Sequence, residues 1–274
     1  MFVLSESAKP KTIGFTFVDL FAGIGGFRIA FEAAGGKCVF SSEYDKFSQL
    51  TYEAFFGEKP DFSQIKSIHP PGDITQLEPY LVPDHDILVA GFPCQPFSLA
   101  GVSKKQSLGR PHGFDDPTQG TLFFNIKEIL RLKKPPVFVL ENVKNLRSHD
   151  QGRTYRIILN TLQRLDYEIS AEVVDAGGWV PQHRERIFIV GFRRDLTGGS
   201  QVHGLNSHFF DFSVLKRPPE PPCLTSILEE QVDDKYTLGE GTWKTLERHK
   251  KFHEKKGQGF GYSILRSPFE GKRT

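Results

Sequence analysis

Short apolar runs alternate with amphipathic segments over roughly the first 195 of the 274 residues. Short runs of branched aliphatic and aromatic residues are typical of buried strands, and an apolar repeat of about 3.6 residues is typical of helices. We therefore expect strands at Phe15–Phe21, Cys38–Glu43, Asp86–Phe92, Pro136–Val143, Glu168–Asp175 and Arg186–Phe192. We expect helices at Gly26–Ala34, Lys46–Phe56, Leu122–Leu132, Tyr155–Leu165 and Lys235–Lys256. The alternation predicts an α/β fold with a mostly parallel sheet, helices on both faces, and the last two strands as an antiparallel hairpin at one edge.

The character of the chain changes after Asp195. Gly198–Ser200 and the proline-rich segment Lys216–Pro222 are typical of irregular connections. We expect one domain over residues 1–195 and, over residues 196–274, a linker followed by the start of a further region. No internal repeat is present.

Composition narrows the class of protein. The chain is 25% charged and 38% hydrophobic, which is typical of a soluble globular protein, and its apolar runs are too short to span a membrane. Residues 1–12 lack the apolar core of a secretory signal. Cys38, Cys94 and Cys223 are odd in number and have no metal-type spacing, so we expect a reduced, cytoplasmic setting and no bound metal.

Charge is distributed unevenly. The net charge is +2, but nine Lys or Arg stand against three Glu from Lys244 to Thr274. A basic end fits a polyanionic partner, although a solvated charged face is the commoner explanation of such a run.

A glycine-rich turn, Asp19–Gly26, follows the first strand and opens a helix. Glycines there let the backbone approach a ligand closely at the helix N-terminus. The turn is not a dinucleotide fingerprint, because the third glycine would stand at position 28, which is Arg28. This argues against a nicotinamide cofactor with its pyrophosphate.

Acidic residues near the ends of the next strands complete a nucleoside pocket. Glu43 can accept both ribose hydroxyls, and Tyr44 can cover an adenine face. Asp73 and Ile74 offer a carboxylate for an exocyclic amine and an aliphatic wall, although Asp73 alone reads as a turn residue. These features predict an adenosine pocket without a phosphate cradle, which suits S-adenosyl-L-methionine.

Two further segments carry candidate chemistry. Cys94 follows the strand Asp86–Phe92 and stands between two prolines that restrict the backbone, although a lone cysteine there is more often a buried apolar residue. Glu141 ends another apolar strand, where burial can raise the pKa of a carboxyl group and keep it neutral. Arg184 and Arg186 precede the last strand, where such arginines are usually surface ion pairs.

Taken together, these segments resemble the C5-cytosine DNA methyltransferases. The matching motifs, in the family's order, are DLFAGIGGFR (Asp19–Arg28), EYD (Glu43–Asp45), GDI (Gly72–Ile74), GFPCQPFS (Gly91–Ser98), GTLF (Gly120–Phe123), ENV (Glu141–Val143) and QHRER (Gln182–Arg186). They cover roughly Phe15 to Arg194. The resemblance implies a Rossmann-like, S-adenosyl-L-methionine-dependent fold and methylation of cytosine C5 in duplex DNA, with S-adenosyl-L-homocysteine as the product.

The resemblance also implies roles for single residues. Cys94 is the expected nucleophile toward cytosine C6, Glu141 the group at N3, Arg186 the contact to O2, and Arg184 a support for the loop or a phosphate contact. The base would have to leave the helix. The expected cofactor-binding residues are Asp19, Phe21, Ala22, Gly23, Gly25, Gly26, Glu43, Tyr44, Asp73, Ile74, Pro93 and Leu122, and the expected DNA-binding residues are Gln95, Ser98, Lys104, Lys105 and Arg110.

Two conserved segments of the family, an arginine-rich stretch and a Gln-x-Gly-Asn-type segment, are not found here. The stretch Cys223–Thr274 resembles the lead-in to a target-recognition region. We expect one subunit of a split bacterial restriction–modification methyltransferase, completed by a second polypeptide and associated with the nucleoid. A truncated chain, a non-catalytic cofactor- or DNA-binding protein, a tRNA methyltransferase and an unrelated thiol enzyme are the alternatives.

Overall fold

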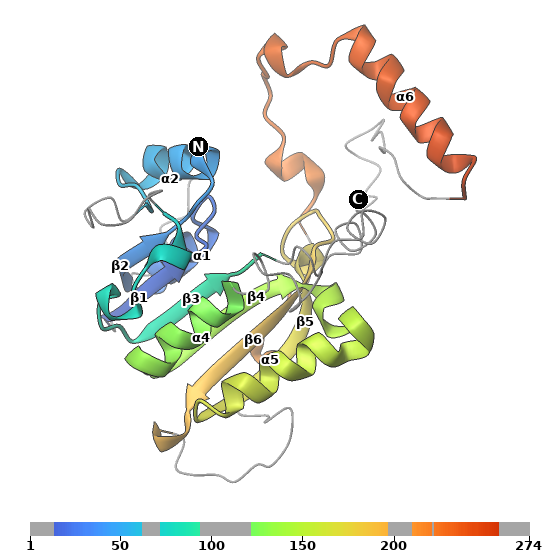
Figure 1. The fold of residues 1–274 in the computed structure, drawn as a ribbon. Helices are drawn as coiled ribbons and strands as arrows, with labels where there is room; N and C mark the ends of the chain where they lie inside the picture. Colours follow the sequence, from blue (N-terminus) through green and yellow to red (C-terminus); the bar gives the residue numbers. More distant parts are fainter. Residues whose placement is uncertain (1–13, 62–71, 94–121, 197–209, 221, 258–274) are drawn as a thin grey trace. The chain divides into compact units, whose positions relative to one another are not determined.

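The computed structural model describes residues 14–61, 72–93, 122–196, 210–220 and 222–257, drawn in colour in Figure 1. The strands are β1 (Phe15–Leu20), β2 (Gly36–Ser42), β3 (Ile87–Gly91), β4 (Val137–Val143), β5 (Tyr167–Asp175) and β6 (Glu185–Arg193). The α-helices are α1 (Gly26–Ala33), α2 (Lys46–Phe56), α4 (Leu122–Lys133), α5 (Arg153–Gln163) and α6 (Glu240–Glu254).

The strands form one sheet in the order β2-β1-β3-β4-β6-β5. The pairs β1–β2, β1–β3 and β3–β4 are parallel, so these four strands end at the same edge of the sheet. β6 runs antiparallel to β4 and lies between β4 and β5, which leaves β5 outermost. The predicted mostly parallel α/β fold is therefore confirmed.

One face of the sheet carries the main hydrophobic core. Because side chains alternate between the faces of a strand, Val18 and Leu20 of β1 lie on the same side as the inward residues of β3 and β4. Figure 1 shows α4 and α5 along this sheet. The cluster includes Leu88, Ala90, Phe138, Leu140, Phe123, Ile126, Ile129, Leu130, Ile158, Leu159 and Leu162.

The opposite face is covered by α1. Phe17 of β1 is fully buried, and its ring centroid lies 5.4 Å from that of Phe31 in α1. Arg28 joins α1 to α2, because its guanidinium donates to the Tyr52 hydroxyl at 3.0 Å and lies 4.4 Å from the ring centroid of Phe56. Helices thus lie on both faces of the sheet.

The last helix begins later than the sequence predicts. The expected helix Lys235–Lys256 is wrong at its N-terminus, since α6 begins at Glu240 after the cap residue Gly239. The preceding residues form a short 3₁₀ turn, Asp234–Tyr236, in which the Asp233 side chain accepts a hydrogen bond from the Lys235 amide. This local capping satisfies backbone groups outside the helix.

Contacts group the chain into two compact units. The first comprises residues 1–174 and 185–214, and the second comprises residues 175–184 and 215–274. The second unit thus contains the loop between β5 and β6 together with the C-terminal segment. The functional boundary expected after residue 195 stays a prediction. Within the described ranges, no helix has the length and apolar character needed to cross a membrane.

Candidate active site

A cavity of about 880 Å³ lies at the carboxyl ends of the parallel strands. In open α/β sheets, ligands bind at this edge. Eight of the twelve expected cofactor-binding residues line the cavity: Phe21, Gly23, Glu43, Tyr44, Asp73, Ile74, Pro93 and Leu122. Five lining residues were not among those expected, namely Ser42, Asp45, Gly72, Thr75 and Gly91, although Asp45, Gly72 and Gly91 stand inside the motifs quoted above.

The turn after β1 is strained and well supported. Phe21 has a φ of 57°, a left-handed conformation that is unusual for a residue with a side chain. The amide of Ala22 donates to the Ser42 carbonyl at 2.9 Å, and the amide of Gly23 donates to Glu43 Oε2 at 2.8 Å. The first two strands therefore hold the turn between them.

Glu43 is fixed from several directions. Its Oε1 accepts a hydrogen bond from the Asp45 amide at 2.6 Å, and its backbone carbonyl accepts one from Gln49 Nε2 at 2.6 Å. The side chain thus presents a preorganised carboxylate on the cavity wall, where two neighbouring hydroxyls of a ribose could be bound.

Gly72 and Asp73 form another part of the cavity wall, next to Glu43. Asp73 caps a short 3₁₀ helix, Ile74–Gln76, by accepting hydrogen bonds from the amide and hydroxyl of Thr75 at 2.9 and 2.7 Å. It is therefore both the turn residue of the simpler interpretation and a lining residue of the cavity. Gly72 has a φ of 86°, and a Cβ there would lie 2.0 Å from the Glu43 carbonyl oxygen. Only glycine fits this position.

Asp19 does not line the cavity. Its side chain is completely buried, and neither carboxylate oxygen has a hydrogen-bond partner among the described residues. Burial raises the pKa of Asp19 to about 7, against a smaller opposing effect of Arg28. Ala22, Gly25 and Gly26 also lie outside the lining, so the structure separates these four residues from the other eight.

Glu141 and Arg186 form an ion pair next to the cavity. Arg186 Nε lies 3.0 Å from Glu141 Oε1, and each side chain is 24% exposed. Glu141 stands at the end of an apolar strand, as the sequence indicated, but its side chain is only partly buried. A Cβ on the lining residue Gly91 would lie 3.6 Å from Glu141 Oε2. The ion pair and the cavity therefore meet at Gly91.

Asn142 is a residue that the sequence analysis did not single out. It is buried, and its Nδ2 donates to the carbonyl of Phe92 at 3.2 Å. This bond ties the end of β4 to the segment that leads into Cys94. Its position inside the ENV motif was the only sequence signal for it.

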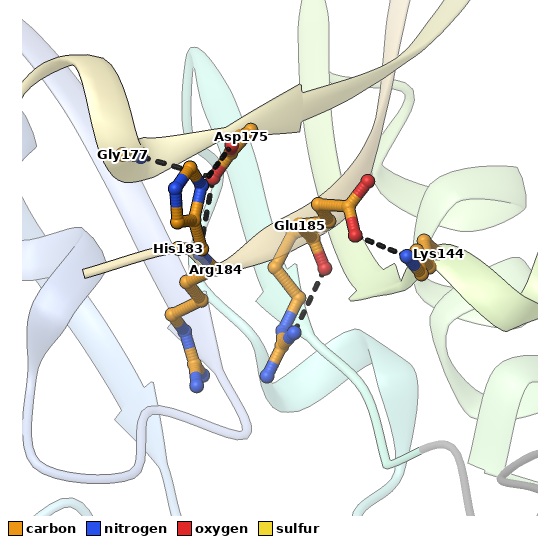
Figure 2. Close-up of polar contacts among 7 residues, drawn as sticks. Lys144, Asp175, Gly177, His183, Arg184 and Glu185 are labelled. Atoms are coloured by element: carbon orange, nitrogen blue, oxygen red, sulfur yellow. Dashed lines mark hydrogen bonds and ion pairs between the residues drawn. The ribbon is translucent and has the colours of Figure 1, made fainter. Parts of the chain in front are cut away.

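The loop between β5 and β6 belongs to the second unit. Figure 2 shows the Asp175 carboxylate facing the His183 ring and the backbone of Gly177 and Arg184. In the first unit, Glu185 at the start of β6 forms an ion pair with Lys144, which follows β4 (Figure 2). Polar contacts therefore hold the loop before β6 and, separately, the first residue of β6.

The expected nucleophile and DNA-contacting residues lie outside the described residues: Cys94, Gln95, Ser98, Lys104, Lys105 and Arg110. Of the other two cysteines, Cys38 is partly buried, which raises its pKa to about 11 and makes it a poor nucleophile at neutral pH. Cys223 is exposed. No group of three or more metal-ligating side chains occurs in the described part of the chain.

Comparison with known proteins adds independent information. Residues 15–273 match the family model for C-5 cytosine-specific DNA methylase. The chain is 45% identical to a DNA-cytosine methyltransferase of Escherichia coli K12, over 92% of this chain and 56% of that protein. It is 46% identical to the type II methyltransferase M.HpaII of Haemophilus parainfluenzae, over 92% of this chain and 63% of that protein. The chain thus spans between half and two thirds of the length of these relatives.

Solved structures give the same fold at lower identity. A Spodoptera frugiperda DNMT2 mutant matches with a TM-score of 0.59 and 20% identity, over 85% of this chain and 65% of that one. The Entamoeba histolytica methyltransferase EhMeth matches with a TM-score of 0.57 and 19% identity, over 82% of this chain and 63% of that one. At such identity the likeness bears on the fold alone.

Proposed function

Since the chain belongs to the C-5 cytosine-specific DNA methylase family, we propose that it transfers a methyl group from S-adenosyl-L-methionine to C5 of cytosine in duplex DNA. The observation that carries this proposal is the meeting of the 880 Å³ cavity with the Glu141–Arg186 pair at Gly91. A methyl donor and a cytosine bound on either side of Gly91 would be adjacent.

The residues around the cavity fit an adenosyl group. Glu43 offers an oriented carboxylate to the ribose, Asp73 an acceptor to the adenine amine, and Ile74 with Phe21 apolar walls. The glycine-rich turn brings no cluster of cations, which agrees with a ligand that lacks phosphate. When bound, S-adenosyl-L-methionine supplies the methyl group and leaves as S-adenosyl-L-homocysteine.

The protein's own groups would activate the base. Cytosine is a weak nucleophile at C5, so the Cys94 thiolate first adds to C6 and makes C5 electron-rich. Glu141 holds N3 and gives it a proton as the adduct forms, while Arg186 binds O2. After methylation, the C5 proton passes to water, the Cys94 thiolate is eliminated, and N3 returns its proton to Glu141, which restores the aromatic ring. Arg184 supports the loop or contacts a phosphate.

This chemistry requires an unstacked base, so base flipping is part of the proposal. The segment after Cys94 carries Gln95, Ser98, Lys104, Lys105 and Arg110, which we assign to DNA contact from their charge and place in the sequence. The type II names of the relatives favour a bacterial restriction–modification setting.

Target recognition by a second polypeptide is a further part of the proposal. It is supported by exposed apolar side chains at and just before α1, where Ile24 is 61% and Ile29 is 44% exposed. Methyl transfer that appears only when the chain is mixed with the polypeptide encoded next to it would support this part. Full, sequence-specific activity of the chain alone would contradict it.

The test is transfer of a labelled methyl group to unmethylated duplex DNA, with tRNA as a parallel substrate. We expect label in DNA, and a loss of at least about a thousandfold for Cys94→Ala, because removal of a nucleophile abolishes the covalent route. Cys223→Ala is the matched control and should retain activity. A covalent adduct with 5-fluorocytosine DNA should form with the wild type and with Cys223→Ala only. Label in tRNA alone, or no adduct, would refute the proposal.

A further inference from the structure

The loop at residues 176–184 is closed at its base. Asp175 Oδ1 accepts hydrogen bonds from the amides of Gly177 at 3.0 Å and Arg184 at 3.1 Å, and Oδ2 lies 2.7 Å from His183 Nδ1. The amide of Ala176 also donates to the Arg184 carbonyl at 3.1 Å. With its first and last residues joined in this way, the loop should move as one piece, and a displacement at its tip should reach Arg184.

The tip of the loop is held by a different part of the chain. Trp179 Nε1 donates to the Lys216 carbonyl at 3.3 Å, and the Arg217 guanidinium carbon lies 5.7 Å from the centroid of the Trp179 ring. That distance is within the range of a cation–π contact. The loop and this segment belong to the same compact unit.

The Arg217 side chain also lies directly against the loop backbone. Gly178 is buried, and a Cβ at this position would lie 2.6 Å from Arg217 Cδ and 2.8 Å from its Cγ. Only a glycine lets the aliphatic part of the arginine approach so closely. The Arg217 side chain therefore contacts both Gly178 and Trp179, whereas Lys216 contacts the loop through its backbone carbonyl.

We propose that Arg217 is a positioning residue for Arg184: seated on Gly178 and Trp179, it fixes the loop that carries Arg184 to the start of the C-terminal region. The proposal rests on the function proposed above, in which Arg184 acts on the DNA substrate. We call the contacts of Lys216 and Arg217 with Gly178 and Trp179 the joint. Through the joint, DNA that binds to the C-terminal region would also set the position of Arg184.

The competing explanation is that Arg217 is only a surface cation that attracts DNA. Arg217→Ala and Lys216→Ala remove the same charge from neighbouring positions, but only the first removes the contacts with the loop. We expect Arg217→Ala to lower kcat at saturating DNA about tenfold or more, because small misplacements of catalytic groups have large effects on rate. Lys216→Ala should stay within about twofold of the wild type. Equal effects of the two variants would overturn the proposal.

A double variant tests whether Arg217 acts through Arg184. If it does, Arg184→Ala with Arg217→Ala should be no slower than Arg184→Ala alone, since coupled residues are not additive. Gly178→Ala, which displaces Arg217 without changing charge, should reproduce the kcat loss. If the kcat losses of the two single variants multiply in the double variant, Arg217 acts independently of Arg184.

Amide hydrogen exchange over residues 176–184 reports on the joint without any activity. Exchange should be faster in Arg217→Ala than in the wild type and Lys216→Ala, and unchanged exchange would overturn the joint. A wild type that binds DNA but never methylates it, with faster exchange in Arg217→Ala, would refute the proposed function and leave the joint standing. If the wild type is active but Arg217→Ala has the same kcat and the same exchange rates as Lys216→Ala, the proposed function stands and the joint is refuted.

Discussion

The rim of the cavity and the loop at residues 176–184 are built in different ways. The rim is made of turns at the ends of buried parallel strands, where backbone amides of Gly23 and Asp45 hold Glu43 in place. The loop depends on the side chain of Asp175, whose side-chain partner His183 is 49% exposed. Backbone geometry set by a sheet is robust, whereas an exposed polar contact competes with water. Mutations should therefore affect the rim through folding and ligand affinity, and the loop through catalysis.

The largest effect is expected beneath the rim, at Asp19. Its pKa is raised to about 7 by burial, whereas an unfolded aspartate titrates near pH 4. The folded state then binds the proton more tightly, so stability falls as pH rises from about 4 to 7 and stays lowered above that. The total is roughly 4 kcal/mol at about 1.4 kcal/mol per pH unit. Asp19→Asn should remove this loss.

Urea unfolding of both proteins at pH 5 and pH 8 checks this expectation. The variant should gain stability relative to the wild type as pH rises between the two values. The same pH dependence in both proteins would show that Asp19 is charged in the folded protein at little cost.

The next effect is expected at Gly72. Gly72→Ala places a methyl group on the Glu43 carbonyl and forces a left-handed backbone on alanine. We expect affinity for S-adenosyl-L-methionine to fall about a hundredfold, because the ribose-facing carboxylate is displaced, as measured by calorimetry. Gly57→Ala is the matched control, since Gly57 has a φ of 75° but nothing within 4 Å of an added Cβ. It should lower stability by about 1 kcal/mol and leave the affinity unchanged. If Gly57→Ala lowers the affinity as much as Gly72→Ala does, backbone strain alone explains the effect.

The smallest effect is expected in the loop, at Asp175. The pKa of this carboxyl is lowered to about 2, chiefly by the Gly177 amide, so the charged acceptor persists above about pH 3. Asp175→Ala should lower kcat for methyl transfer about fivefold with little change in the unfolding midpoint. Asp175→Asn keeps an acceptor for both amides and should recover most of the rate. Asp233→Ala, which removes a similar cap in the second unit, is the control. A drop in unfolding midpoint that parallels the rate would contradict a local role.

The sequence by itself determined the elements, the α/β class and the family. Apolar runs of strand length and amphipathic segments are local patterns, so the order of strands and helices can be predicted without the tertiary structure. The family's motifs can be found in the same way, because each is a short run of consecutive residues. Of the expected cofactor residues, those at strand ends, such as Glu43 and Asp73, line the cavity because parallel strands end at one edge. The start of α6 was misplaced because capping by Asp233 and Gly239 competes with a weak helical pattern.

Only the tertiary structure decided which polar groups face each other. Asp19 stands in the same motif as Phe21, yet it lies within β1 and is completely buried, whereas Phe21 lies in the turn after the strand and lines the cavity. The pairing of Glu141 with Arg186 and of Asn142 with the Phe92 carbonyl joins residues 45 and 50 positions apart. The seat of Arg217 on Gly178 joins residues 39 positions apart. Such contacts depend on strand order and chain crossing, which no local pattern of residues encodes.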